Sequence, residues 1–159
     1  GTSEGMPKDL KCSVIPSWAS VSGSSEEEIA RIATLSPKIL HYQEDMWVFG
    51  MTLTDGTKTI GGKKKYADKT ADMPENLTKI EVCFRKHEMS FHHIIFYGST
   101  TVYMGLTKEH DERYYKDRPD GHAGRVETVV LAPGEQLLGC ELYHDDWIRG
   151  VTFLIWKAV

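Results

Sequence analysis

The stretch Phe91-His92-His93-Ile94-Ile95-Phe96-Tyr97 decides the fold class of this 159-residue chain. Successive side chains of an extended strand point to opposite faces of a sheet. Ile95 and Tyr97 therefore share one face with Phe91, while Ile94 and Phe96 occupy the other. Because both faces carry large apolar side chains, the stretch predicts a β-strand that is covered on both sides.

Outward from this strand, the same short extended runs recur along most of the chain. Alternating apolar residues begin at Trp47, and Asp55-Gly56 then predicts a tight hairpin turn. Short strands at this spacing, separated by turn residues, are typical of antiparallel sheets and not of alternating βαβ units. The sequence therefore predicts an all-β fold, with further strands at 47–53, 79–84, 101–104, 126–131, 137–143 and 148–156.

The N-terminal region breaks this pattern. Residues 1–23 are rich in small and polar residues, so we expect a tail or an extended segment lying on the domain. Ser25 and Glu28 form a capping-box pattern, which predicts one short helix over 25–36. Residues 24–159 are accordingly expected to form a single β-rich binding domain.

A second interruption lies at residues 107–125, which are long, polar and charged. Polar loops of this length on a rigid sheet commonly carry function. A disordered insertion would have the same composition, and the sequence leaves both interpretations open.

Charge and cysteine content restrict the classes of partner and compartment. The net charge is −4, and Lys63-Lys64-Lys65 is the single dense basic run, so we expect no nucleic-acid partner. No apolar run reaches the roughly 20 residues that a membrane helix needs, so we expect no membrane insertion. Cys12, Cys83 and Cys140 fit neither a disulfide framework nor a zinc ribbon. Unpaired thiols slightly favour an intracellular location, which otherwise stays open.

The histidines do not predict a catalytic or metal centre. His87 and His92 are one residue too far apart to share a helical face. His92 and His93 are neighbours in a predicted strand, where they should point to opposite faces. Two His-carboxylate groups, at 110–112 and 144–146, fall in predicted loops, where such clusters are usually only solvated. We therefore expect no enzyme activity, no metal and no cofactor.

Four segments carry a resemblance to a known family: LTKIEV at 77–82, HHIIFYG at 92–98, LAPGEQLLG at 131–139 and IRGVTF at 148–153. Their order resembles the jacalin-related lectins over about residues 47–159. The resemblance implies a β-prism of Greek-key antiparallel sheets, with a β-sandwich as the alternative. It also implies non-catalytic carbohydrate binding through loops at one end of the prism.

The chain departs from this family at the sugar-binding signature. The family's Gly-x-x-x-Asp loop is expected after the strand that contains Phe153, and the residues that follow Phe153 in this sequence do not contain it. The hairpin at 47–60 could supply the missing sheet by a circular permutation. Such a permutation would place Asp55 or the Gly61-Gly62 turn near the binding end.

A carbohydrate site needs carboxylates that accept hydroxyl hydrogen bonds, glycine turns that present backbone N–H groups, and an aromatic ring for the apolar sugar face. Trp147 could instead be a strand-edge aromatic that only covers core. The alternative function is that of a protein-interaction domain in a larger intracellular protein. The expected partner is therefore a glycan or a protein. The sequence does not indicate the oligomeric state of the chain. The candidate ligand-binding residues are Asp55, Gly61, Gly62, Tyr114, Tyr115, Asp145, Asp146 and Trp147.

Overall fold

The computed structural model describes residues 10–15, 36–44, 48–52, 60–61, 68–105, 112–113, 115–118 and 121–157. Antiparallel strands account for most of these residues. No helix in the described part of the chain has the length and apolar character needed to cross a membrane. The strands are β1 (Lys11–Ile15), β2 (Ile39–Glu44), β3 (Val48–Thr52), β4 (Ile60–Gly61), β5 (Lys69–Asp72), β6 (Lys79–Arg85), β7 (Phe91–Tyr97), β8 (Thr101–Gly105), β9 (Ala123–Val130), β10 (Glu135–His144) and β11 (Ile148–Lys157).

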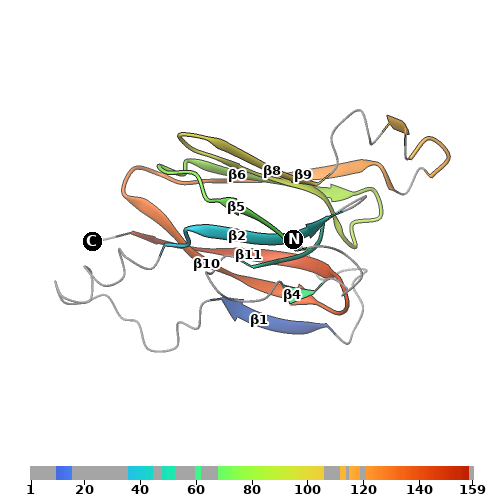
Figure 1. Cartoon of the computed structure of the whole chain (residues 1–159), viewed down its shortest axis with the longest axis horizontal. Coiled ribbons are helices and arrows are strands. Elements are labelled where there is room, and N and C mark those ends of the chain that lie inside the picture. Colours follow the sequence, from blue (N-terminus) through green and yellow to red (C-terminus); the bar gives the residue numbers. More distant parts are fainter. Residues whose placement is uncertain are drawn as a thin grey trace.

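The strands form three groups that enclose a common core (Figure 1). One sheet has the order β1-β10-β11. The other strands are hydrogen-bonded as β5-β2-β3-β4 and β9-β6-β7-β8, and the single pair Val48↔Phe91 joins these two groups. In each four-stranded group the last strand returns beside the first, which is the Greek-key order. This arrangement confirms the predicted β-prism of Greek-key antiparallel sheets.

Side chains from all three groups meet in the interior. Leu40 of β2, Phe96 of β7 and Leu142 of β10 are fully buried. Phe96 also makes an edge-to-face contact with Phe153 of β11, with 6.1 Å between the ring centroids. Burying each side chain of this size contributes roughly 1.5–3 kcal/mol. The alternating apolar residues of the strands therefore hold the three groups together.

The described residues confirm most of the predicted strands and add others. The strand predicted at 91–97 is found with the same bounds. β9 begins at Ala123, three residues before the predicted start, inside the segment expected to be a polar loop. This edge strand exposes most of its side chains, so its polar sequence gave no apolar alternation. Most of the helix predicted at 25–36, and the Asp55-Gly56 turn, lie outside the described residues.

The N-terminal region contributes a strand to the domain. β1 pairs with β10 along its whole length, from Lys11↔His144 to Ile15↔Cys140. This strand lies within the range expected to be a tail or an extended segment. Its register places the N-terminal region on the sheet that also carries the β10–β11 hairpin.

The strand directions define two ends of the prism. The hairpin end contains the β10–β11 turn at 145–147 and the β6–β7 turn at 86–90. The groove end contains the turns at 73–78, 98–100 and 131–134, where β6 and β10 begin and β7 finishes. Ligand sites at these two ends can therefore be tested independently.

Candidate functional site at the hairpin end

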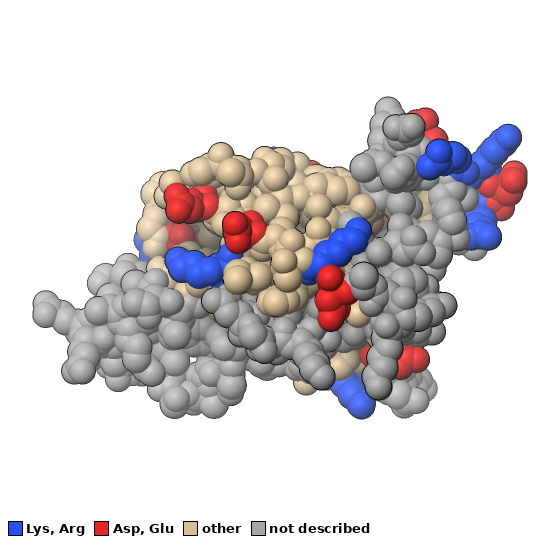
Figure 2. All heavy atoms as spheres, in the orientation of Figure 1, with Lys and Arg blue, Asp and Glu red and all other residues tan. Residues whose placement is uncertain are grey.

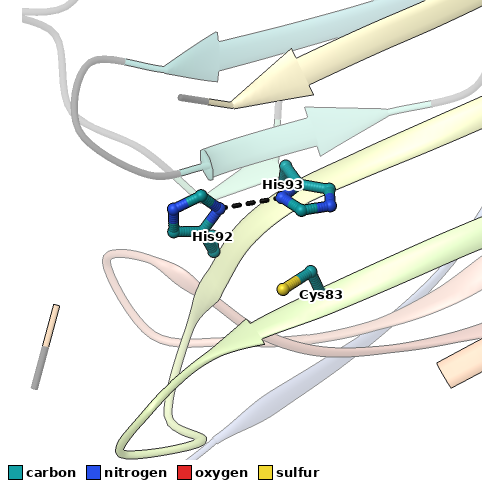
Figure 3. Close-up of side chains that lie close together, drawn as sticks. All are labelled: Cys83, His92 and His93. Carbon is teal, nitrogen blue, oxygen red and sulfur yellow. Dashed lines mark hydrogen bonds between the residues drawn. The ribbon is translucent and has the colours of Figure 1, made fainter. Parts of the chain in front are cut away.

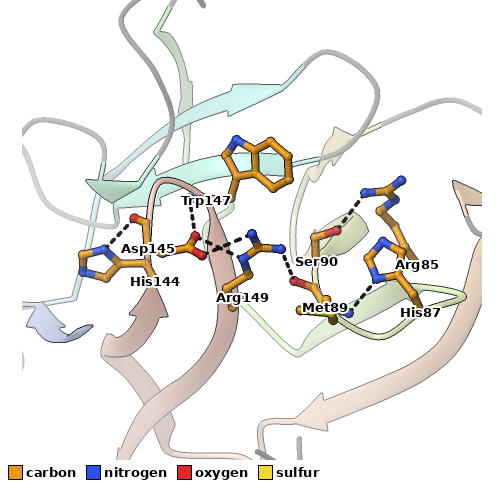
Figure 4. Close-up of polar contacts among 8 residues, drawn as sticks. All are labelled: Arg85, His87, Met89, Ser90, His144, Asp145, Trp147 and Arg149. Atoms are coloured by element: carbon orange, nitrogen blue, oxygen red, sulfur yellow. Dashed lines mark hydrogen bonds and ion pairs between the residues drawn. The ribbon is translucent and has the colours of Figure 1, made fainter. Parts of the chain in front are cut away.

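The β10–β11 hairpin turns through Asp145, Asp146 and Trp147 (Figure 4). The backbone N–H of Trp147 donates a hydrogen bond to Oδ1 of Asp145 at 2.9 Å. The backbone N–H of Asp145 donates in turn to the carbonyl oxygen of Trp147 at 3.1 Å. Aspartate often accepts a hydrogen bond from the backbone two residues later, which fixes a turn locally. The Asp-Asp-Trp sequence thus shapes its own hairpin tip.

Arg149 holds this tip from the side. Its Nε and Nη2 donate to the two carboxylate oxygens of Asp145, at 3.1 and 3.2 Å. The guanidinium carbon also lies 4.8 Å from the centroid of the Trp147 ring. A two-point arginine–carboxylate pair is geometrically specific, and the ring contact adds a cation–π interaction. Arg149 therefore fixes both the carboxylate and the indole.

The same arginine connects the tip to the β6–β7 turn. Nη1 of Arg149 donates to the carbonyl oxygen of Met89 at 3.1 Å. Within that turn, Arg85 Nη1 donates to Ser90 Oγ at 3.1 Å, and the N–H of Met89 donates to His87 Nδ1 at 2.9 Å. Figure 4 shows these contacts running from the tip to the turn. Two loops that are far apart in sequence are thereby held in one arrangement.

The electrostatics of the tip keep Asp145 ionised. Partial burial disfavours the charged carboxylate, but the hydrogen bonds from Arg149 and from the Trp147 amide outweigh it and lower the pKa of Asp145. Both of its oxygens accept hydrogen bonds from the protein. Asp145 and Asp146 are both exposed to solvent, but Asp145 acts mainly as a positioning residue because its oxygens already accept hydrogen bonds from the protein.

This arrangement is suited to binding a polar ligand. The exposed carboxylate of Asp146 can accept hydrogen bonds from hydroxyl groups. Trp147 is the next residue of the turn, and its half-buried indole offers apolar contact area. A carboxylate beside an aromatic ring on a fixed turn can receive a ligand with hydroxyl groups and an apolar face.

The structure brings together some of the predicted site residues and separates others. Asp145, Asp146 and Trp147 share the hairpin tip, and Gly61 lies in β4 opposite Gly50 of β3. Tyr115 is only 1% exposed, so its ring offers no free face to a ligand and does not belong to the hairpin-tip site. The remaining candidates, Asp55, Gly62 and Tyr114, lie outside the described residues.

Sequence reasoning missed Arg149, although a signal for it exists. Asp145 and Arg149 stand four residues apart on either side of a turn between two predicted strands. In a hairpin, residues on either side of a short turn face each other, so opposite charges at these positions can pair. The pairing could have been predicted from this spacing, whereas the contact with Met89 depends on how the sheets pack.

A groove of about 860 Å³ lies at the opposite end of the prism. Asp72, Asn76 and Glu135 line it together with apolar residues such as Leu77 and Leu137. The side-chain amide of Asn76 donates to Ser99 Oγ at 3.1 Å across one wall. Sequence reasoning could not find this groove, because its lining comes from four separate segments.

The described surface shows no basic patch on the face drawn in Figure 2. Its lysine and arginine side chains lie beside aspartate and glutamate side chains. Clustered positive charge is what nucleic-acid binding requires. No such cluster is visible among the described residues on that face.

A third cluster lies beside the β6–β7 turn, where Cys83 of β6 meets His92 and His93 of β7 (Figure 3). The two imidazole Nδ1 atoms are 2.8 Å apart and share a hydrogen bond. One ligand atom from each of the three residues lies within 4.8 Å of the others. The expectation that the two histidines point apart is therefore wrong.

A β-bulge explains why the two histidines come together. Cys83 pairs with His93, whereas the next residue, Phe84, pairs with Phe91, so His92 is an extra residue in β7. A bulge breaks the strict alternation of faces and can redirect a side chain. Sequence alternation alone could not show this, because the bulge is defined by the partner strand.

Comparisons with known proteins identify the fold. No known family profile matches the chain, and no curated protein sequence matches it. Among solved structures, the second β-prism domain of RbmC from V. cholerae, bound to N-acetylglucosaminyl-β-1,2-mannose, matches with a TM-score of 0.54 and 15% identity. The alignment covers 74% of this chain and 85% of that domain.

Two further structures give the same result. A prostate-specific WGA16 glycoprotein lectin matches with a TM-score of 0.56 and 11% identity, over 77% of this chain and 83% of the lectin. The V. cholerae biofilm matrix protein Bap1 matches with a TM-score of 0.53 and 17% identity over 76% of this chain. The chain spans only 20% of the length of Bap1. At these identities the likeness establishes the fold, and the chain shares the β-prism fold of jacalin-like lectins.

Proposed function

We propose that this chain is a non-catalytic glycan-binding module whose site is the hairpin tip. The observation that carries the proposal is the exposed Asp146, adjacent in sequence to Trp147, on a turn that Arg149 holds in place. The β-prism fold supports it, because one protein with this fold was solved with a mannose-containing disaccharide bound. The circular permutation and a ligand-binding role for Gly61 and Gly62 stay hypotheses.

The residues have separate roles in this proposal. Asp146 accepts hydrogen bonds from sugar hydroxyl groups, and the indole of Trp147 packs against the apolar face of the sugar. Asp145 and Arg149 position these two groups and do not contact the ligand. Replacement of a contacting residue should therefore abolish binding without loss of the fold, whereas replacement of a positioning residue should also lower stability.

The test is a glycan array with the full chain, followed by titration calorimetry with the best ligand and with N-acetylglucosaminyl-β-1,2-mannose. We expect Asp146→Ala and Trp147→Ala to abolish binding while circular dichroism stays unchanged. Asn76→Ala, in the groove at the other end, is the control and should bind as the wild type does. Binding that depends on Asn76 and not on Asp146 would move the site to the groove.

A blank array from folded protein would contradict carbohydrate binding and favour the protein-interaction alternative. For that function the exposed surface of β9 is the specific candidate, because Val126 and Val130 are 50% and 70% exposed there. Edge strands with exposed apolar side chains can pair with another chain. Replacing either valine by lysine should then weaken partner binding and leave the hairpin tip intact.

A further inference from the structure

The cluster formed by Cys83, His92 and His93 has the donor atoms of a transition-metal site. One thiol and two imidazole groups are ligands that Zn²⁺ prefers, and Zn²⁺ sites with three protein ligands keep a fourth position for water or another group. Cys83 and His92 are 1% and 3% exposed, and the His93 side chain is 15% exposed. The cluster is thus shielded from solvent but reachable from the His93 side.

The distances are close to those that a bound ion requires. With Zn–N bonds of about 2.0–2.1 Å and Zn–S bonds of about 2.3 Å, a tetrahedral site has its nitrogen atoms about 3.3 Å apart and each nitrogen about 3.5 Å from sulfur. The two Nδ1 atoms are at 2.8 Å, and the donor atoms of all three residues lie within 4.8 Å. Side-chain rotations that move the donor atoms by about 1 Å would therefore complete the site.

The surroundings of His93 supply the outer support that metal-bound histidines commonly have. Its other ring nitrogen, Nε2, lies 3.5 Å from Oε2 of Glu81. A carboxylate that accepts the second N–H of a metal-bound imidazole fixes the ring and leaves Nδ1 free to bind the ion. Tyr103 stacks on the His93 ring, with 5.2 Å between the two ring centroids.

The backbone beside the cluster is also closely packed. Gly105 of β8 lies opposite His93, with φ of +123°, and a Cβ at this position would clash with the carbonyl oxygen of His92. A glycine with positive φ is therefore needed for β8 to approach the bulge. The buried ring of Tyr115 lies 6.4 Å from that of His92. These contacts hold the two imidazoles in position before any ion binds.

We propose that Cys83, His92 and His93 bind one Zn²⁺ ion. Binding replaces the hydrogen bond between the two histidines: both rings take the tautomer with a proton on Nε2, and each Nδ1 lone pair coordinates the ion. The Cys83 thiol loses its proton to solvent and coordinates as the thiolate. The site is separate from the hairpin tip, so it does not depend on the proposed glycan binding.

The experiment is a calorimetric titration of the metal-free full chain with Zn²⁺ alone. We expect one ion per chain and a loss of binding in Cys83→Ser and in His93→Gln. Glu81→Gln should weaken binding by about 10- to 100-fold, as expected when the outer partner of a metal-bound histidine is removed. Cys140→Ser and His144→Gln remove the same residue types elsewhere and should bind Zn²⁺ as the wild type does.

A second measurement keeps the test decisive if a variant does not fold. Co²⁺ added to the wild-type chain should give a thiolate-to-cobalt charge-transfer band, and added Zn²⁺ should remove it. Folded wild-type protein that binds no Zn²⁺ would overturn the proposal, as would Zn²⁺ binding that Cys83→Ser and His93→Gln leave unchanged. A cobalt complex without the thiolate band would overturn the role of Cys83.

Discussion

Arg149→Ala should destabilise the hairpin end by an amount that can be worked out from its contacts. The side chain is 14% exposed and makes a two-point pair with Asp145, a hydrogen bond to the Met89 carbonyl and a ring contact with Trp147. A partly exposed ion pair contributes about 0.5–1 kcal/mol. The hydrogen bond adds about 1 kcal/mol, and the cation–π contact about 0.5–1 kcal/mol. The free energy of unfolding should fall by roughly 2–3 kcal/mol in total.

For a chain of this size, such a loss corresponds to a decrease in Tm of roughly 5–10 °C. Differential scanning calorimetry at about pH 7 and about pH 2.5 measures it and also tests the part that depends on charge. The pKa of Asp145 is lowered in the folded chain, so its contribution is complete above the pKa of the unfolded carboxyl and is lost as the pH falls through the folded value. The difference in Tm between Arg149→Ala and the wild type should therefore be smaller in acid than at neutral pH.

The control is Arg113→Ala, which removes an exposed arginine from the segment between β8 and β9. It should leave Tm within about 1 °C of wild type, as most surface substitutions do. An unchanged Tm for Arg149→Ala at neutral pH would refute the view that this residue joins the two turns. A loss of the same size at both pH values would refute the contribution of the ion pair with Asp145.

Three further predictions concern the core, the bulge and the thiols. Leu142→Ala, at a fully buried position, should lower the free energy of unfolding in urea by about 2–5 kcal/mol; a loss below about 1 kcal/mol would argue against the packed interior. Gly105→Ala should lower the free energy of unfolding by at least about 1–3 kcal/mol, because Gly105 has a positive φ and lies close to the His92 carbonyl oxygen. A variant as stable as the wild type would contradict this backbone geometry. Burial raises the pKa of the Cys140 thiol to about 12. Iodoacetamide at about pH 9 should therefore alkylate the exposed Cys12 before Cys140, as followed by mass spectrometry. Equal rates of alkylation would show that Cys140 is accessible.

Most of the buried strands were predictable from the sequence. β6, β7, β10 and β11 were found from their apolar patterns, because such strands are covered by core on at least one face. β1, β2, β4 and β5 were not predicted as strands, and the start of β9 was placed too late. β1, β4, β5 and β9 lie at edges of the described sheets, where solvent allows polar residues, so their local sequence resembles that of a loop. β2 lies between β3 and β5, so an edge position does not explain why it was missed.

The candidate site was predictable only in part. The Asp145-Asp146-Trp147 group stood out because an aromatic residue and two carboxylates are adjacent in sequence. The sequence did not show that Asp145 is already used by Arg149, or that Tyr115 is buried. Both facts depend on contacts between segments, and one sequence carries no record of such contacts.

The sequence by itself determined the all-β class, the position of most buried strands and the composition of the hairpin tip, because each of these follows from residues that are neighbours along the chain. The tertiary structure alone decided the three-sheet prism, the contact between Arg149 and Met89, and the meeting of Cys83 with His92 and His93. The pairing of β6 with β7 contains one extra residue on β7, and that register turns two neighbouring histidines toward each other. Strand register depends on the packing of distant segments, so only the folded chain shows it.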